Sequence, residues 1–277
     1  MTIHLIDGTY ELFRQFYGAR RFNEGIDAPL GAVAGVLHSI LQMIEKDATH
    51  IGVATDHVIE SFRNDLWPGY KTATGMEPNL TNQFHPLEDA LKAMGVATWP
   101  MVELECDDGL ASAAHLAARD PRVEKICIWS PDKDLAQCVV GDRVVVVDRR
   151  NDTIRGEEGV IEKFGVLPMY IPDLLALVGD AADGYPGIPK IGKVTAAKLI
   201  NKYGGIEDFP TEVLGDNLKN ALLFKHLATL RIDAPLFDDV DKTRWRGPTP
   251  EFADWAAKMS DDRIVQRAQK ATAMISG

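Results

Sequence analysis

The sequence has few of the residues that build disulfides or zinc sites. Its 277 residues include three cysteines and seven histidines. The cysteine number is odd and no two cysteines have metal-ligand spacing, so we expect reduced thiols in a cytoplasmic protein. The histidines form neither an HxxxH nor an HxH pattern, which argues against a zinc site.

Long apolar runs and a secretion signal are also missing. No stretch approaches the roughly 20 apolar residues that a membrane-spanning helix needs. The start, Met1-Thr2-Ile3-His4, is not a basic segment followed by an apolar one, so we predict no signal peptide and no membrane partner. We find neither internal repeats nor low-complexity tracts. The length suits one α/β domain with a small added subdomain.

An excess of positive charge is missing as well. The chain has 41 acidic residues against 30 Lys and Arg, and its net charge is −11. Taken over the whole chain, this balance argues against nucleic-acid binding. One interpretation is a merely soluble surface. The other is that the acids gather at one place where metal ions neutralise them, so that the remaining surface carries basic patches.

The pattern of apolar residues predicts strands that alternate with helices. Residues 64–82 contain Pro68, Gly69, Gly75 and Pro78 with little periodicity, and we expect an irregular segment there. Asp107 is a candidate cap for a helix near 109–118. The predicted strands are 3–6, 51–54, 126–129 and 144–147, and the other predicted helices are 29–45, 84–94, 168–178, 193–203 and 251–273. This alternation predicts a mainly parallel sheet covered by helices.

Nine acids occur where strands end or helices begin. Ligands of open parallel sheets gather at the carboxyl ends of the strands, so acids that follow different strands should meet there. Carboxylates crowded in this way need cations, and Mg²⁺ prefers oxygen ligands. Alone, each acid reads as a turn, cap or loop residue. The nine are Asp7, Asp56, Glu105, Asp107, Asp108, Asp132, Asp134, Asp180 and Asp183.

Basic residues gather at two other places. The turn Gly187-Ile188-Pro189-Lys190-Ile191-Gly192 matches the helix-hairpin-helix pattern G-h-P-x-h-G, whose backbone N–H groups approach phosphates closely. Lysines in and after this turn would add charge along a DNA strand, and the alternative is a solvated lysine face. They are Lys190, Lys193, Lys198 and Lys202.

The second basic place is the irregular segment and its start. Arg63 and Lys71 are candidates to stabilise charge on a scissile phosphate. Tyr70 is a candidate to stack on a base. Taken alone, each of the three reads more readily as an ordinary surface residue.

As an ordered set, these motifs resemble the 5′-nuclease family, which includes the N-terminal nuclease domain of bacterial DNA polymerase I, phage 5′-exonucleases and flap endonucleases. The resemblance covers about residues 3–248. It rests on Ile6-Asp7-Gly8, Asp56, Phe62-Arg63, Tyr70-Lys71, Glu105-Cys106-Asp107-Asp108, Asp132-Lys133-Asp134-Leu135, Gly179-Asp180-Ala181-Ala182-Asp183, the hairpin turn, Thr195-Ala196-Ala197-Lys198-Leu199 and Arg244-Trp245-Arg246-Gly247-Pro248.

The resemblance implies a PIN-like α/β catalytic domain over 1–165, with a helical arch near 62–85, and a DNA-binding helix-hairpin-helix subdomain with a helical tail over 166–277. It implies a stand-alone, metal-dependent 5′-3′ exonuclease or flap endonuclease that cleaves 5′ flaps and nicked or branched DNA in replication and repair. Two or more Mg²⁺ or Mn²⁺ ions would activate water, and K⁺ would sit at the hairpin turn. The first metal group would be Asp7, Asp56, Glu105 and Asp107, with Asp108 nearby, and the second Asp132, Asp134, Asp180 and Asp183.

One departure from the family pattern keeps two alternatives open. Family members often have Y-K-x-x-R in the arch, whereas Tyr70-Lys71 is followed by Thr72, Ala73 and Thr74. A weakly active or silent junction-binding protein of the same fold is therefore the first alternative. The second, a PIN-like ribonuclease, is disfavoured because such domains generally lack the hairpin extension at 184–203.

Overall fold

The protein is built around a twisted six-stranded sheet in this computed structural model, which describes residues 1–20 and 28–276. The strand order is β3-β2-β1-β4-β5-β6; neighbouring strands run parallel except for β6, which is antiparallel to β5. The predicted mainly parallel sheet is confirmed. The strands are β1 Thr2–Asp7, β2 His50–Asp56, β3 Ala97–Met101, β4 Lys125–Trp129, β5 Val144–Asp148 and β6 Thr153–Arg155.

Alternating side chains along each strand supply a separate hydrophobic core on each face of the sheet. On β1 and β4, Ile3, Leu5 and Ile128 join the core beneath α6 (Cys106–Ala118). On β2, Ile51 and Val53 join the opposite core. Because both faces are covered, the strands read as nearly continuous apolar runs, as in other parallel sheets.

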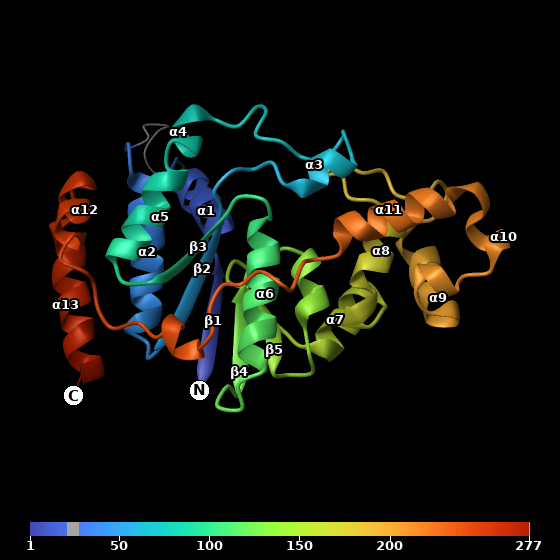
Figure 1. Cartoon of the computed structure of the whole chain (residues 1–277). Coiled ribbons are helices and arrows are strands. Elements are labelled where there is room, and N and C mark those ends of the chain that lie inside the picture. The colour runs from blue at the N-terminus through green and yellow to red at the C-terminus, as the bar shows by residue number, and fades with distance from the viewer. Residues whose placement is uncertain (21–27, 277) are drawn as a thin grey trace.

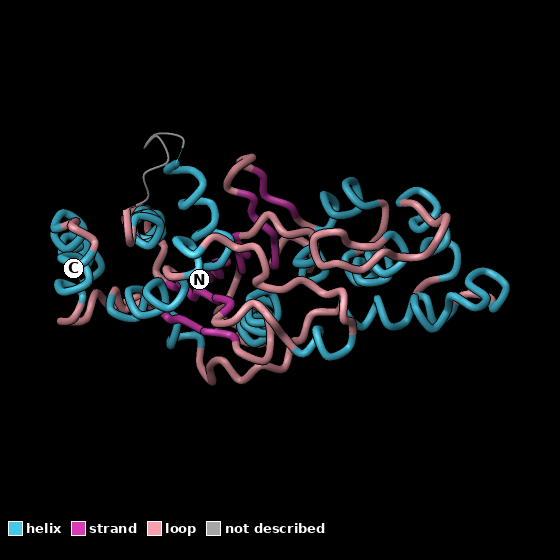
Figure 2. The backbone as a smooth tube through the Cα atoms, turned by 90° about the horizontal axis from the view of Figure 1, so that it is seen from above, coloured by secondary structure: helices cyan, strands magenta, loops and turns pink. Residues whose placement is uncertain are grey.

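Helices cover both faces of the sheet (Figures 1 and 2). One layer contains α1 Gly8–Arg20, α2 Gly31–Ile44 and α5 Phe84–Ala93, and the C-terminal pair α12 Phe252–Lys258 and α13 Asp262–Ser276 packs outside it. The opposite layer contains α6. Among the described residues, no helix is long and apolar enough to cross a membrane.

A helical extension continues to one side of the sheet (Figure 1). The main contact within it is between α8 and α11, and α9 follows α8 through a turn-rich loop. The elements of this region are α7 Glu157–Phe164, α8 Ile171–Val178, α9 Lys193–Tyr203, α10 Thr211–Leu214 and α11 Leu218–Ala228.

The segment that passes over the carboxyl ends of the strands contains only two short helices, α3 Phe62–Leu66 and α4 Pro78–Thr81 (Figure 1). Loop joins them, as the prolines and glycines of 64–82 predict, so this arch is less helical than the family resemblance implies. The segment is tied to the helical extension by Trp67 Nε1, which donates to Gly184 O at 2.9 Å. A Cβ at Gly184 would lie 1.9 Å from Gly69 O, so only glycine fits there.

Some predicted element ends were wrong. The expected helix 251–273 is two helices, because Ser260 takes a positive φ of 55° between them. The N-cap of α6 is Glu105 and not Asp107: the Glu105 N–H donates to Asp108 Oδ2 at 2.9 Å, as in a capping box. Asp107 therefore lies two residues after the cap, in the first turn of α6.

Candidate metal centre

Two acids at strand ends and one at a helix start form a first group at the carboxyl edge of the sheet. Asp7 ends β1, Asp56 ends β2 and Asp107 lies in the first turn of α6. Carboxylate oxygens of Asp7 and Asp107 and the sulfur of Cys106 lie within 4.8 Å of one another. Backbone groups fix these acids: the Tyr10 N–H donates to Asp7 Oδ1 at 2.7 Å and the Cys106 N–H to Asp56 Oδ1 at 2.8 Å.

Burial and crowding raise the proton affinity of this first group. Burial, opposed by hydrogen bonds from Tyr10 and Ser130 and assisted by the charge of Asp56, raises the pKa of Asp7 to about 7. Burial likewise raises the pKa of Asp56 to about 6. The pKa of Asp107 is raised by burial and then by the charges of Asp132 and Asp7. Such carboxylates favour any cation that can replace the protons.

Three more acids form a second group beside the helical extension. Oxygens of Asp134, Asp180 and Asp183 lie within 4.8 Å of one another. Burial, followed by the charges of Asp132 and Asp183, raises the pKa of Asp134. Asp134 Oδ1 is buried and has no hydrogen-bond partner among the described residues. Asp180 is placed by a tight turn in which the Ala182 N–H donates to Asp180 Oδ1 at 3.0 Å.

Two lysines contact the second group, and one of them joins it to the first. Lys71 Nζ lies 2.7 Å from Glu105 Oε2 and 3.1 Å from Asp183 Oδ1. Burial alone would lower the pKa of Lys71, but the charges of Glu105 and Asp183 raise it above its ordinary value. Lys133 pairs with Asp180. The motif Asp132-Lys133-Asp134-Leu135 does not by itself indicate this role for Lys133.

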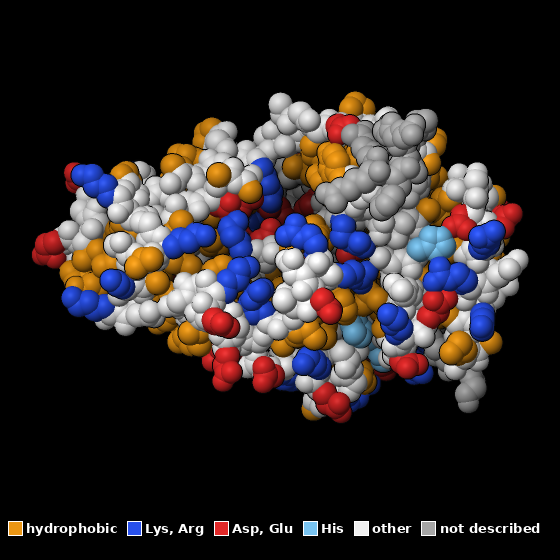
Figure 3. Space-filling model, turned by 180° about the vertical axis from the view of Figure 1, so that it is seen from behind, with side chains coloured by type: hydrophobic (Ala, Val, Ile, Leu, Met, Phe, Trp, Pro, Cys, Tyr) orange, Lys and Arg blue, Asp and Glu red, His pale blue; other side chains and the backbone are white. Residues whose placement is uncertain are grey.

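A hollow in the surface gives access to the first group. Acidic side chains line this hollow, and Lys and Arg side chains lie along its rim (Figure 3). Its lining includes Asp132, which is exposed and whose charge reaches both Asp107 and Asp134. The lining residues are Asp7, Thr9, Tyr10, Phe13, Asp56, Lys71, Glu105, Cys106, Asp107 and Asp132.

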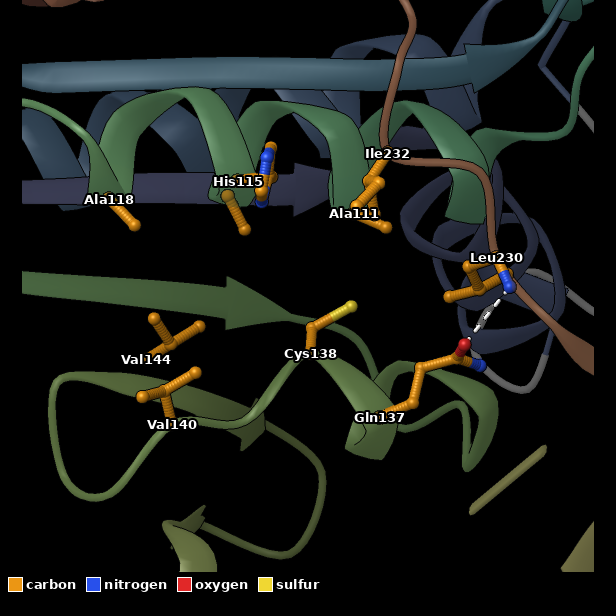
Figure 4. A pocket seen from close by; sticks show the side chains of 10 residues that line it. Ala111, His115, Ala118, Gln137, Cys138, Val140, Val144, Leu230 and Ile232 are labelled. Carbon is orange, nitrogen blue, oxygen red and sulfur yellow. Dashed lines mark hydrogen bonds between the residues drawn. The ribbon is translucent and has the colours of Figure 1, made fainter. Parts of the chain in front are cut away.

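A second pocket lies away from the acids and does not compete as the reactive site. It lies beneath α6, and alanines of this helix and aliphatic side chains of the facing segments line it (Figure 4). Gln137 Oε1 closes one end by accepting from the Leu230 N–H at 3.0 Å. The lining includes no acidic or basic side chain other than His115, so this pocket offers no metal ligands of the kind that the two acid groups provide.

The structure revises the roles expected for Arg63 and Asp108. Arg63 is only 1% exposed and donates to both oxygens of Asp108, at 2.7 and 2.8 Å, and to Glu105 Oε1 at 3.2 Å. It also donates to Leu227 O at 2.7 Å. A buried guanidinium with these partners cannot reach a substrate phosphate, and the fully buried Asp108 is its counter-ion. The pair ties α3 and α6 to the end of α11.

Tyr70 is also placed differently from the expectation. Its side chain is 5% exposed and lies in the hydrophobic core, and its hydroxyl donates to Glu105 Oε2 at 3.4 Å. Stacking on a base needs an exposed ring. The buried Tyr70 ring instead packs in the core beneath the 62–83 segment. Glu105 thus has Lys71, Arg63 and Tyr70 around it. Burial would raise the pKa of Glu105, but Lys71 and Arg63 lower it.

The predicted hairpin turn lies between α8 and α9, and all four of its lysines are exposed. Gly187 has φ 72°, and a Cβ there would lie 2.3 Å from Gly179 N, so the turn requires glycine. Gly192 is the N-cap of α9, which leaves backbone N–H groups of the first turn free for an anion. The lysines are Lys190, Lys193, Lys198 and Lys202.

The residues fit divalent cations. Hard cations bind carboxylate oxygens. The raised pKa values of Asp7 and Asp134, and the lack of a hydrogen bond to Asp134 Oδ1 among the described residues, mark places where a positive charge would be stabilised. Lys71 and Lys133 supply part of that charge through their ammonium groups. The buried Cys106 thiol is a poor additional ligand, because burial and the charge of Asp7 raise its pKa.

Comparison with known proteins gives a consistent result. A family model described as "5'-3' exonuclease, N-terminal resolvase-like domain" matches residues 2–165, and one described as "5'-3' exonuclease, C-terminal SAM fold" matches 166–251. The chain is 30% identical over 254 residues to the 5′-3′ exonuclease of Buchnera aphidicola subsp. Schizaphis graminum, covering 84% of this chain and 88% of the relative. It is 33% identical to DNA polymerase I of Rhizobium leguminosarum, covering 86% of this chain and 25% of that protein.

Solved structures share the fold at low identity. The D15 flap endonuclease of bacteriophage T5, in a complex with DNA and metal ions, has a TM-score of 0.68 at 17% identity, over 100% of both chains. Flap endonuclease-1 from Methanococcus jannaschii has a TM-score of 0.65 at 15% identity, over 99% of this chain and 92% of that one. Fold, acid groups and family matches agree: the chain belongs to the 5′-3′ exonuclease family of metal-dependent nucleases.

Proposed function

We propose that this protein is a structure-specific 5′-nuclease that hydrolyses DNA phosphodiesters near junctions of single-stranded and duplex DNA. The observation that carries the proposal is the pair of acid groups joined by Lys71 under the 62–83 segment, with an exposed lysine-bearing hairpin beside them. An acidic centre handles the phosphate through cations, and the hairpin holds the flanking duplex.

The cations would be Mg²⁺ or Mn²⁺, held by the two acid groups. Asp7, Asp56 and Asp107, with Glu105 at the edge, would hold the first, and Asp134, Asp180 and Asp183 the second, with Asp132 between them. When bound, such ions activate water and neutralise charge on the phosphate. Asp108 is removed from this set because Arg63 takes both of its oxygens.

Lys71 is the residue proposed to contact the scissile phosphate. Its side chain is 34% exposed in the lining of the hollow, so it can exchange a carboxylate partner for a phosphate oxygen. A fixed ammonium group there stabilises charge that develops in the transition state. Arg63 acts only indirectly, by holding Glu105 and α6 in place.

The hairpin is proposed to bind the phosphate backbone of duplex DNA, with K⁺ at its turn. The free N–H groups after Gly192 and the exposed lysines support this role. We place the catalytic domain at 1–165 and the DNA-binding subdomain and tail at 166–277, a division supported by the ends of the two family matches. A cytoplasmic location remains a prediction.

The test is cleavage of a 5′-flap, a nicked duplex and single-stranded DNA in Mg²⁺, with the product ends mapped. Asp107→Asn and Asp134→Asn remove one ligand from each group and should each lower cleavage by about 100-fold or more while flap binding persists. Asp254→Asn, on the exposed face of α12, is the matched control. Undiminished cleavage by either of the first two variants would sink the proposal.

One alternative keeps a specific observation in its favour. Thr74 stands where family members often have an arginine. The absence of that arginine favours a junction-binding protein that cleaves DNA slowly or not at all. Flap binding without product in either Mg²⁺ or Mn²⁺ would select that alternative. Including single-stranded RNA among the substrates separates both from a PIN-like ribonuclease.

A further inference from the structure

Three of the buried polar atoms without a hydrogen bond belong to the second acid group and to the tyrosine that follows it. Within the described residues, five buried side-chain nitrogen or oxygen atoms have no hydrogen-bond partner, and among these are Asp134 Oδ1, Asp180 Oδ2 and the hydroxyl of Tyr185. Lys133 forms ion pairs with both carboxylate oxygens, at 3.9 Å from Asp134 Oδ1, whereas the Tyr185 hydroxyl has no hydrogen-bond partner among the described residues. Unsatisfied buried polar atoms are uncommon in folded proteins, and an ordered water often joins them.

The turn that carries Asp180 also holds Tyr185 in place. Its backbone pairs with Asp180 in both directions, with N···O distances of 2.9 and 3.0 Å. Its ring is 2% exposed and stacks on Phe224 at 5.5 Å, and Phe224 in turn meets Trp67 edge-on at 5.2 Å. The phenol is therefore rigid and shielded from solvent, and its position is fixed by the same turn that positions Asp180.

The charges around the hydroxyl come mainly from the second group. Burial, followed by the charges of Asp134, Asp180 and Asp183, raises the pKa of Tyr185. A phenol hydroxyl has both a donor and an acceptor to offer. Asp134 Oδ1 offers an acceptor. A water from the hydration shell of a cation, which Mg²⁺ normally retains in proteins, supplies the matching partners for both atoms.

We propose that Tyr185 is a positioning residue of the second acid group, and that its hydroxyl hydrogen-bonds to the hydration shell of a divalent cation held by Asp134, Asp180 and Asp183. The inference rests on the proposed function, because it needs a cation at that group. It adds to that function a residue that carries no charge and that the acidic motifs do not include. Partners of this outer kind typically contribute about 10–100-fold in metal affinity.

The experiment measures Mn²⁺ binding to the full chain without DNA, by calorimetry and by the electron paramagnetic resonance of free Mn²⁺. Tyr185→Phe keeps the stacked ring and removes only the hydroxyl. Tyr203→Phe, on α9 and packed against Phe209, is the matched control. We expect Tyr185→Phe to weaken one class of Mn²⁺ site by about tenfold or more, with the other class and the control unchanged.

Two backgrounds assign the affected class. In the Asp7→Asn background, in which the first group is disabled, Tyr185→Phe should weaken the binding of the remaining Mn²⁺ ion. In Asp183→Asn, which disables the second, it should change nothing. Mn²⁺ should also change the near-ultraviolet difference spectrum of tyrosine in the wild type, and this change should disappear in Tyr185→Phe.

Failure of the inference and failure of the proposed function give different results. If the wild type binds two ions and cleaves DNA but Tyr185→Phe binds Mn²⁺ as the wild type does, only the role of Tyr185 is overturned. A lower melting temperature without a change in Mn²⁺ affinity has the same meaning, since it assigns the hydroxyl to packing alone. If the wild type loses no Mn²⁺ site on Asp183→Asn, the second metal group itself is overturned.

Discussion

The two acid groups are built by different means, although we propose that they act on the same phosphate. The first lies at the ends of β1 and β2, where the sheet fixes the backbone and N–H groups from Tyr10 and Cys106 hold the carboxylates. The second lies on turns next to the helical extension, where Lys133 and a tight turn hold Asp180. The edge of the sheet thus supplies one group. The contact between the sheet and the helical extension, called the joint below, supplies the other.

Because of this difference, substitutions in the two groups should affect activity to different extents. Two acids of the first group, Asp7 and Asp56, stand on strands of one sheet, so we expect its geometry to be less sensitive than that of the second group to changes in the helical extension. The second group is complete only when the 179–185 turn docks beside Gly69 and Trp67. We therefore expect loss of the first group to remove activity outright and damage at the joint to weaken it.

The largest expected effect comes from breaking the first group. Asp7→Asn should lower cleavage of a 5′-flap by at least about 1000-fold, because a lost metal ligand removes several kcal/mol of charge stabilisation. Asp183→Asn should cost about tenfold less, since it leaves the first group intact. Single-turnover rates in Mg²⁺ measure both. Equal losses would erase the proposed distinction between the groups.

Removing the residue that joins the groups should have the next largest effect. Lys71→Met is expected to lower the single-turnover rate by about 10²–10³-fold, in line with the loss of one preorganised donor. Flap binding should change little, because the hairpin supplies most phosphate contacts. Lys92→Met, an exposed lysine near Asp89, is the control. A loss of binding equal to the loss of rate would assign Lys71 to substrate affinity alone.

Arg63 tests the link between the sheet and the helical extension. Arg63→Met leaves Asp108 buried without its counter-ion, and we expect about 3–5 kcal/mol lower free energy of unfolding. Arg122→Met removes an exposed arginine with three acidic partners and should lower the free energy of unfolding far less, because exposed ion pairs contribute little. Urea denaturation compares the two. If Arg63→Met is as stable as Arg122→Met, the pair does not join the regions as described.

The smallest effect is the pH dependence of stabilisation by metal. The folded-state pKa of Asp7, about 7, and of Asp56, about 6, lie above the ordinary 3.8, so these groups hold protons in the folded protein that the unfolded chain releases. Without metal, stability therefore falls as pH rises from about 4 to about 7. Mg²⁺ must displace those protons, so it should raise the melting temperature more at about pH 8 than at about pH 5.

The control for that measurement is Asp7→Asn. This variant lacks one of the protons that burial retains, so its metal-free stability should fall less over the same pH range, and Mg²⁺ should stabilise it less at high pH. A metal-free protein whose stability rises steadily across that range would contradict the burial of these carboxylates.

The sequence by itself determined the alternation of strands and helices, the acids at the strand ends and the hairpin turn. Apolar runs such as Ile3–Ile6 and Ile51–Ala54 carry these signals locally, and parallel pairing forces their carboxyl ends to one edge. The strand at 97–101 gave a weaker signal, because Pro100 interrupts a short run on an edge strand. Its parallel pairing with β2 defines this strand.

Which charged residues are buried and which line the hollow became clear from the folded chain alone. Arg63 and Lys71 look alike in the sequence, yet the first is buried against α11 and the second lines the hollow. Asp107 and Asp108 are neighbours, yet the 100° step of a helix directs one to the first acid group and the other to Arg63. Arg63 takes its partners from Asp108, 45 residues away, and from Leu227, 164 residues away, and no local pattern records such contacts.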